Sequence, residues 1–368
     1  MNKIPLIRPY IDQDIKNRVL AVLESGMLTE GEVTRAFEEA VRSFIGCRRA
    51  IAVTSCTTGL ELALRALEVG PGDEVIVPDY TYPATADVVA IVGATIVIVD
   101  VDRETMLIDC DAVERAVTPR TKALIPVSLF GNPLDYDRLL KIRKEHGLSI
   151  VEDAACSLGA AWRGEKVGTF ADITVFSLHP RKFITTGEGG IITTDSQAWA
   201  DWMESYKHFG MGVQDSRLTT SFERIGTNYK LSNLLAAVGL GQMVKIDELL
   251  DRRLALAQRY RDKLRGVNGI EFSRTTEGGT HSCQSFCVLI RDRNRVLDTL
   301  RGMGIEVQIG TYSLHMHPAF QSSEYCRIPG TLEGSAHAFQ HCLTLPLYHD
   351  MTEDEQDRVV SELIRALG

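Results

Sequence analysis

The sequence lacks the features of several large protein classes. It has no uninterrupted apolar run of the roughly 18 residues that a membrane-spanning helix needs. Its first residues contain no apolar block of the kind that marks a secretory signal. The basic residues are scattered and the formal net charge is -9, so the basic patch of a nucleic-acid-binding protein is missing as well. We therefore expect a cytoplasmic protein with neither a membrane nor a nucleic-acid partner.

The eight cysteines include no CxxC pair. They are spread over the chain at positions 47, 56, 110, 156, 283, 287, 326 and 342. This spacing supports neither a disulfide framework nor a zinc site. The densest group of potential ligands is His281, Cys283 and Cys287 in "HSCQSFC", and buried free cysteine explains it better. No metal site is expected.

Two glycine-rich phosphate motifs are also missing. No GxGxxG follows the first predicted strand and no GxxxxGK[ST] occurs anywhere, which argues against a dinucleotide-binding or a P-loop protein. What remains is an ordinary globular composition, with 44% hydrophobic and 24% charged residues among 368. A chain of this length can bury a large core and suggests two domains, or one large and one small.

Short apolar runs alternate with helical patterns from about residue 34 to 195. Runs rich in Val and Ile predict strands at 50–55, 73–79, 95–102 and 148–155. A helix closed by glycine is predicted between the first two, in "TTGLELALRALEVG". Strands that are apolar on both faces and separated by helices favour a mostly parallel sheet covered on each side. The predicted fold class is α/β.

The pattern changes to long helices after residue 195. The run at 231–266 is longer than a usual globular helix, so we expect it to bend or break on its way between domains. We place the boundary near residue 250, with a large α/β domain at 1–250 and a smaller α+β domain at 251–368.

Ligands of an open α/β sheet bind at the carboxyl ends of its strands, so those positions are the first candidates for a site. Thr57 and Thr58 open a helix after the first strand, where backbone N–H groups and two hydroxyls suit one phosphate. A plain helix cap is the alternative. Tyr80 and Tyr82 follow the next strand, and either ring could stack on a flat heterocycle or simply pack in a turn.

Glu152 and Asp153 end a later strand. Adjacent strand residues point to opposite faces, so at most one of them faces the crevice. A buried acid needs a partner. A protonated ring nitrogen would be one, and a hydrogen bond to a loop would be another.

Lys182 lies in "SLHPRKFITTGEGG", between a strand that ends at Ser177 and a glycine-rich reversal. A single lysine in a loop is normally a solvated charge. Here we expect partial burial, which lowers the pKa of an ammonium and makes the amine a nucleophile. Phosphate donors, an aromatic ring, an acid for a ring nitrogen and an activated lysine together match the needs of pyridoxal 5'-phosphate (PLP).

The same residues carry a resemblance to the DegT/StrS family of PLP-dependent sugar aminotransferases, in the aspartate aminotransferase fold group (fold type I). It extends over nearly the whole chain. The segments that carry it include "AVTSCTTGLELALRAL", "VEDAACSLGAAWRGEKVGTFADITVFSLHPRKFITTGEGG" and "IGTNYKLSNLLAAVGLGQM". The resemblance implies a three-layer α/β fold with a smaller C-terminal α+β domain.

The resemblance also implies roles for single residues. Lys182 matches the lysine that forms the Schiff base with PLP and moves the proton, and Asp153 matches the acid that keeps the pyridine nitrogen protonated. Tyr82 matches the aromatic residue that stacks on the ring.

Further matches concern the cofactor phosphate. Ser177, Thr57 and Thr58 match its ligands, and Asn228 in "GTNYK" resembles an asparagine that reaches it across a dimer interface. The resemblance therefore implies a homodimer in which two chains share each active site.

Two positions depart from the family pattern. Cys156 stands where members usually have Gln or His, whose side chain hydrogen-bonds the phenolic oxygen of PLP. Cysteine is a poor donor, so we expect this contact to be lost or supplied by water. Met27 stands where an aromatic residue is frequent, on the side of the substrate.

The implied reaction moves an amino group from L-glutamate to the keto group of a nucleotide-linked deoxysugar, at C3 or C4, through the pyridoxamine (PMP) form of the cofactor. The product would be an amino sugar for surface polysaccharide or glycoside biosynthesis. Kinetics should be ping-pong. His315, in "GTYSLHMHPAF", is a candidate substrate contact, and a structural histidine is the alternative.

Four other functions deserve comparison. A pyridoxamine-dependent dehydratase of the same family has histidine in place of Lys182, which argues against it. A transaminase acting on a keto-cyclitol agrees with the sequence equally well. A PLP-binding regulator without activity is opposed by the intact lysine and acid. A nicotinamide-dependent oxidoreductase is opposed by the missing glycine motif.

Overall fold

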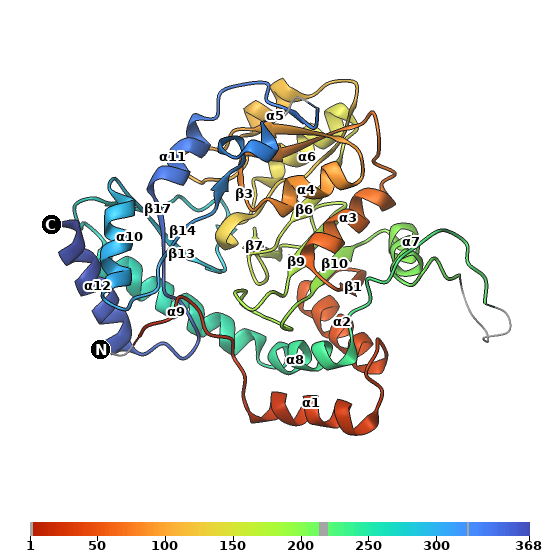
Figure 1. The fold of residues 1–368 in the computed structure, drawn as a ribbon, viewed down its shortest axis with the longest axis horizontal. Coiled ribbons are helices and arrows are strands. Elements are labelled where there is room, and N and C mark those ends of the chain that lie inside the picture. Colours follow the sequence, from red (N-terminus) through yellow and green to blue (C-terminus); the bar gives the residue numbers. More distant parts are fainter. Residues whose placement is uncertain (1–2, 213–219, 322–323) are drawn as a thin grey trace.

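The protein is described by a computed structural model that covers residues 3–212, 220–321 and 324–368 (Figure 1). Its largest element is an eight-stranded sheet with the order β1-β10-β9-β6-β5-β2-β4-β16. The neighbours from β9 to β16 run parallel, and β10 is antiparallel to both of its neighbours. The strands of this sheet are β1 (Arg49–Val53), β2 (Glu74–Pro78), β4 (Thr95–Val99), β5 (Thr121–Leu124), β6 (Ser149–Asp153), β9 (Ile173–Ser177), β10 (Gly190–Thr194) and β16 (Cys326–Arg327).

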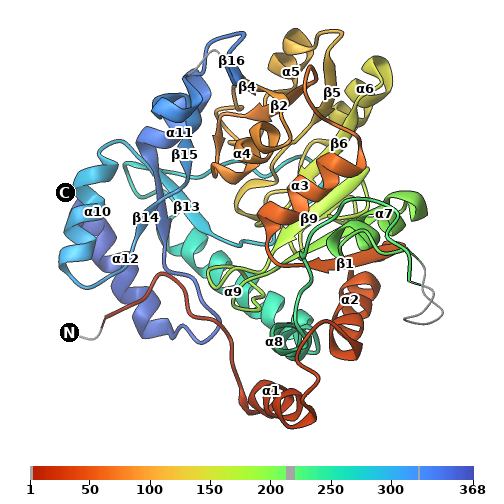
Figure 2. The same ribbon diagram turned by 45° about the vertical axis from the view of Figure 1, so that its right-hand side comes forward.

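Helices cover both faces of this large sheet (Figures 1 and 2). The α-helices of the described residues are α1 (Gln13–Ser25), α2 (Glu32–Ile45), α3 (Cys56–Ala66), α4 (Ala84–Ile91), α5 (Cys110–Ala116), α6 (Tyr136–His146), α7 (Gln197–Lys207), α8 (Asn233–Met243), α9 (Ile246–Leu264), α10 (Arg293–Gly302), α11 (Glu333–His341) and α12 (Glu353–Leu367). The predicted α/β class with a mostly parallel sheet is confirmed.

The alternation of side chains along each strand divides the core into two clusters. Val75 and Val77 of β2 pack on one face with α3, α4 and α7, whereas Ile76 packs on the other with α2, α5, α6 and α8. All three residues are fully buried. A strand whose two faces are both covered must be apolar at consecutive positions, which is why these segments read as continuous Val/Ile runs.

A smaller antiparallel sheet forms a third core (left side of Figure 1). Its strands, in spatial order, are β11 (Ile270–Glu271), β13 (Phe286–Ile290), β17 (Cys342–Leu345) and β14 (Gln308–Ile309). It packs against α9, α10 and α12, and Ile4 from the start of the chain joins the same cluster. The placement of a domain boundary near residue 250 stays a prediction, since α9 runs through that position.

Two further small sheets are present in the described residues. A three-stranded sheet has the order β12 (Gly279–Thr280), β7 (Ala161–Trp162), β8 (Glu165–Lys166), and β15 (Tyr312–Ser313) pairs with β3 (Tyr80–Thr81). In the described ranges no helix is both long and apolar enough to cross a lipid bilayer.

The long helical run expected at 231–266 is broken into α8 and α9, as predicted. The residues of α8 pack close to α1 and α2 (Figure 2). A Cβ on Gly239 would lie 2.7 Å from the Phe37 ring, and one on Gly241 would lie 2.6 Å from the Ile15 side chain. Glycine at these two positions therefore permits the close helix contact.

The helix after the first strand ends earlier than expected. It stops at Ala66, and the chain leaves the helical conformation at Glu68, whose φ is 56°. The expectation that glycine closes this helix is wrong, because the turn is made by a non-glycine residue before Gly70.

Candidate active site

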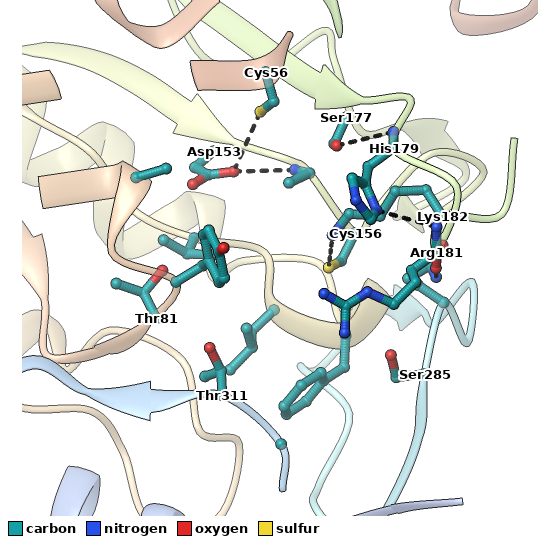
Figure 3. A pocket seen from close by; sticks show the side chains of 18 of the residues that line it. Cys56, Thr81, Asp153, Cys156, Ser177, His179, Arg181, Lys182, Ser285 and Thr311 are labelled. Carbon is teal, nitrogen blue, oxygen red and sulfur yellow. Dashed lines mark hydrogen bonds between the residues drawn. The ribbon is translucent and has the colours of Figure 1, made fainter. Parts of the chain in front are cut away.

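A cavity of about 400 Å³ lies between the large sheet and the small sheet (Figure 3). Its walls come from the segments that follow β1, β6 and β9, and from β14 and β17 on the opposite side. This is the crevice at the carboxyl ends of the strands that the α/β class predicts. Six of the predicted site residues line it: Thr57, Tyr82, Asp153, Cys156, Ser177 and Lys182.

Asp153 is the last residue of β6 and only 5% exposed. Thr85 donates a hydrogen bond of 2.7 Å to its Oδ2, and the Ala155 N–H donates one of 3.1 Å to its Oδ1. Burial raises the pKa of Asp153 above its usual value, and these two donors limit the rise. A positively charged partner in the cavity would stabilise the carboxylate further.

Glu152 points to the other face of the sheet, as adjacent strand residues must. The Tyr136 hydroxyl donates a 2.9 Å hydrogen bond to its Oε1. Burial raises the pKa of Glu152 to about 7. Of the two adjacent acids, Asp153 alone lines the cavity, which agrees with the prediction that at most one does.

Lys182 lies in the loop after β9, and its side chain points into the cavity toward Cys156 (Figure 3). The Lys182 backbone N–H donates a 2.8 Å hydrogen bond to the His179 carbonyl, and the side-chain Nζ is 3.1 Å from the Cys156 Sγ. Because Cys156 belongs to the segment after β6, this contact joins the ends of two neighbouring strands.

The pKa of Lys182 departs from expectation. Burial lowers it, but the neighbouring Cys156, and then Cys56 and Asp153, outweigh burial, so the pKa is raised. The prediction of a lowered pKa is wrong for the protein without cofactor, because it considered desolvation and not the acidic groups around the amine.

Gln284 fixes the backbone on both sides of Lys182. Its Nε2 donates to the Arg181 carbonyl at 2.8 Å, and its Oε1 accepts from the Phe183 N–H at 2.5 Å. Gln284 is itself buried, and the Arg253 guanidinium donates a 2.9 Å hydrogen bond to the Gln284 backbone carbonyl. The reactive lysine is therefore held by a residue about a hundred positions away in the sequence.

The start of α3 forms one end of the cavity. The first N–H groups of a helix have no acceptor within the helix, so this end can bind an anion. A Cβ on Gly190 would lie 2.7 Å from the Cys56 nitrogen, so glycine there lets β10 approach the helix start. Thr57 and Ser177 contribute hydroxyls to the same wall.

Three predicted site residues do not line the cavity of this chain. Thr58 forms a capping box with Ser55, so its hydroxyl serves the helix end. Asn228 accepts a 2.6 Å hydrogen bond from the Lys230 ammonium. His315 has its Nδ1 2.6 Å from the Asp79 Oδ2, and Asp79 is fully buried. Their proposed roles stay predictions.

Sequence reasoning missed several residues that line the cavity, and it missed Thr85, a buried residue behind the lining that holds Asp153. Thr85 pairs with Asp153 although 68 positions separate them, and Cys56 places its Sγ 4.0 Å from Asp153 Oδ1. Arg181, Gln284 and Gln308 also line the cavity. Only Arg181 had a signal in the sequence, because it precedes the lysine; the other contacts depend on tertiary structure.

The residues that line the cavity match those that PLP requires. The carboxylate of Asp153, whose charged form burial disfavours, faces the cavity, and the amine of Lys182 points into the same cavity. The N–H groups at the start of α3 and the hydroxyls of Thr57 and Ser177 form a site for an anion. Tyr82 is 61% exposed and lies on the cavity wall, where its ring is free to cover a flat ligand.

Comparisons with known proteins give the same answer. The sequence model of the DegT/DnrJ/EryC1/StrS aminotransferase family matches residues 9–364. The uncharacterized protein MJ1066 of Methanocaldococcus jannaschii is 33% identical over 97% of this chain and 96% of its own length.

Solved structures agree with the fold over the full length. "Putative sugar aminotransferase Spr1654" of Streptococcus pneumoniae, in its PLP form, has a TM-score of 0.92 and 29% identity, and the match covers 100% of this chain and 99% of Spr1654. DesV of S. venezuelae, in complex with a ketimine intermediate, has a TM-score of 0.91 and 31% identity. The match covers 99% of this chain and 98% of DesV.

The match of the family along nearly the whole chain and the residues of the cavity lead to one conclusion. The chain belongs to the DegT/DnrJ/EryC1/StrS aminotransferase family, as its motifs predicted, and is a PLP-dependent transaminase.

Proposed function

We propose that this aminotransferase moves the amino group of L-glutamate to the keto group, at C3 or C4, of a nucleotide-linked deoxysugar in the cytoplasm. The observation that carries the proposal is the placement of Lys182 and Asp153 in one cavity, at the ends of neighbouring strands. The sugar part is supported by Spr1654, a protein of the same fold that is named "putative sugar aminotransferase".

The residues of the chain divide the chemistry between them. Bound PLP supplies an aldehyde that takes up an amine and a ring that withdraws electrons from the reacting carbon. Lys182 holds the cofactor until the donor amine takes its place. Its free Nζ would then act as the base that removes the proton from the α-carbon of the donor, and as the acid that returns it.

Asp153 is the acid of the cavity, and Thr85 and the Ala155 N–H hold its carboxylate in position. With PLP bound, this carboxylate would accept a hydrogen bond from the protonated ring nitrogen and keep that proton in place. The keto acceptor then receives the amino group by the same steps in reverse. Donor and acceptor are consequently used in turn.

We propose further that two copies of the chain complete each site. Asn228 lies outside the cavity of its own chain, in a segment that exposes large apolar side chains: Phe222 is 64% exposed and Ile225 is 93% exposed. A second copy would cover this surface and bring Asn228 to the phosphate of the partner site.

Mixing two variants that carry their defects in different chains tests the shared site. Lys182→Ala lacks the amine, and Asn228→Ala lacks the amide that serves the partner. If the subunits are mixed, one site of each heterodimer is intact, so part of the activity should return. Absence of any recovery in exchanged dimers would contradict a shared site.

The substrate is tested with a panel of nucleotide-linked 3-keto and 4-keto sugars. Glutamate should convert the loaded enzyme from the PLP to the PMP absorbance spectrum, and the correct keto sugar should restore the PLP spectrum. Restoration by a keto-cyclitol and by none of the nucleotide-linked sugars would overturn the proposed acceptor.

A further inference from the structure

The cavity contains one cation that the chemistry described so far does not use. Among the described residues that line it, two carry permanent or near-permanent positive charges, Arg181 and Lys182. The Lys182 amine would be taken up in holding the cofactor. Arg181 then remains as the cation of the cavity, and arginine stays protonated at every physiological pH.

Arg181 has no acidic partner. Its Nη1 is 3.3 Å from the Gln308 Oε1, and no described carboxylate oxygen lies within 4.0 Å of its guanidinium. Other arginines of the chain pair with acids; Arg138, for example, lies 2.5 Å from Asp111. A guanidinium in a cavity that contacts only a neutral amide has donors left for an anion.

The Arg181 side chain extends from the loop after β9 toward the reacting amine. Figure 3 shows it reaching into the cavity beside Cys156, below the Lys182 amine. Gln284 holds the Arg181 backbone carbonyl at 2.8 Å, and the Arg181 backbone N–H lies 3.2 Å from the His179 ring nitrogen. The backbone is therefore held in place, while the side chain is exposed and its guanidinium is accessible to a ligand that enters the cavity.

We propose that Arg181 binds a carboxylate of the amino donor and thereby selects an acidic amino acid. The inference rests on the proposed transfer from glutamate and deepens it. A carboxylate matches the planar pair of N–H donors that guanidinium presents. The acceptor of the second half-reaction carries a diphosphate, which has the same anionic chemistry, and the two half-reactions can be measured separately.

The experiment follows the glutamate half-reaction of PLP-loaded Arg181→Gln by the change from the PLP to the PMP spectrum. We expect the glutamate concentration for half-maximal rate to rise about 10- to 100-fold, which corresponds to the loss of one charged hydrogen-bond pair. The maximal rate should change much less, since Lys182 and Asp153 are intact. Arg181→Lys should recover part of the loss.

A second readout does not depend on turnover. Glutarate has two carboxylates and no amine, so it binds without reacting, and calorimetry on the loaded enzyme should give a weaker affinity for Arg181→Gln by a similar factor. Arg265→Gln, which removes a surface arginine paired with Asp262, is the matched control and should behave as wild type. Circular dichroism checks that each variant is folded.

Each result decides the inference. Unchanged glutamate saturation and glutarate affinity in Arg181→Gln would overturn it. A defect confined to the keto-sugar half-reaction would also overturn it and assign Arg181 to the diphosphate. If glutamate does not change the spectrum of the wild type at all, the proposed donor fails instead, and that outcome is seen before any variant is made.

Discussion

The floor and the rim of the cavity differ in how their residues are held. The floor, which we define as Asp153, Cys156 and Lys182, sits at the ends of β6 and β9, and Asp153 is only 5% exposed. The rim, which we define as Tyr82, Arg181 and Tyr312, comes from loops and a short edge pair, and Tyr82 is 61% exposed. The floor is built for one reaction, and the rim is open to variation in the substrate.

The largest effect should follow from removing the amine of the floor. Lys182→Ala should slow both half-reactions by at least about 1000-fold, because covalent and proton-transfer functions are lost together. Some PLP should stay bound without a covalent bond. The measurement is the rate of spectral change with glutamate, and Lys144→Ala, on an exposed face of α6, is the control. Turnover by Lys182→Ala near the wild-type rate would contradict the assignment.

The next effect concerns the acid of the floor. Asp153→Asn keeps the shape and the acceptor for Thr85 but loses the charge that holds the ring proton. We expect kcat to fall about 100-fold or more, within the range for a lost proton-holding group. Steady-state kinetics with glutamate and a keto sugar would measure it. An Asp153→Asn enzyme with wild-type kcat would show that the ring nitrogen has another partner.

A smaller effect is expected at the rim. Tyr82→Ala should weaken PLP binding about 2- to 10-fold, the equivalent of about 0.5–1.5 kcal/mol for an aromatic stack, and leave kcat nearly unchanged. Tyr82→Phe keeps the ring and should bind PLP as the wild type does. Titration of cofactor-free protein with PLP gives these affinities. Equal losses in the two variants would mean that the hydroxyl, not the ring, makes the contact.

The smallest effect on activity should come from the neighbour of Asp153. Glu152→Gln lies on the opposite face of the sheet and keeps the hydrogen bond from Tyr136, so kcat should stay within about twofold of wild type. Its effect appears in stability. The pKa of Glu152 is raised to about 7 by burial, from a usual 4.5.

The sign of this pH effect follows from proton binding. Between about pH 4.5 and about pH 7 the folded state keeps a proton that the unfolded state releases, so the free energy of unfolding falls as pH rises through that window. The part of this loss that belongs to Glu152 is on the order of 3 kcal/mol, so the free energy of unfolding should fall by that much less in Glu152→Gln than in the wild type over the same window. Urea unfolding of the cofactor-free proteins measures it. Parallel curves for both proteins would contradict a titration at Glu152.

The comparison also explains what the sequence could predict. The acidic pair Glu152 and Asp153, Ser177 and Lys182 can be located because strand ends and a glycine-rich reversal are readable from local patterns, and parallel strands bring their ends to one edge. The choice between Glu152 and Asp153 was left open by the two-residue period of a strand, which shows that they differ but not which one faces the cavity.

The partners of these residues could not be predicted in the same way. Gln284 bonds the backbone N–H of Phe183, which lies 101 positions earlier in the sequence. Thr85 bonds Asp153, which lies 68 positions later. Nothing in the local sequence indicates such contacts, because they join segments that only the tertiary fold brings together. The raised pKa of Lys182 was missed for the same reason: the acidic groups that raise it come from other segments.

The proposed chemistry depends on a covalent bond between Lys182 and PLP, and chemical reduction of the loaded enzyme tests whether that bond exists. Borohydride reduction of the PLP-loaded wild type, followed by peptide mass spectrometry, should locate a reduced pyridoxyl group on the Lys182 side chain. A pyridoxyl group on another lysine, or none on protein whose spectrum shows bound PLP, would contradict it.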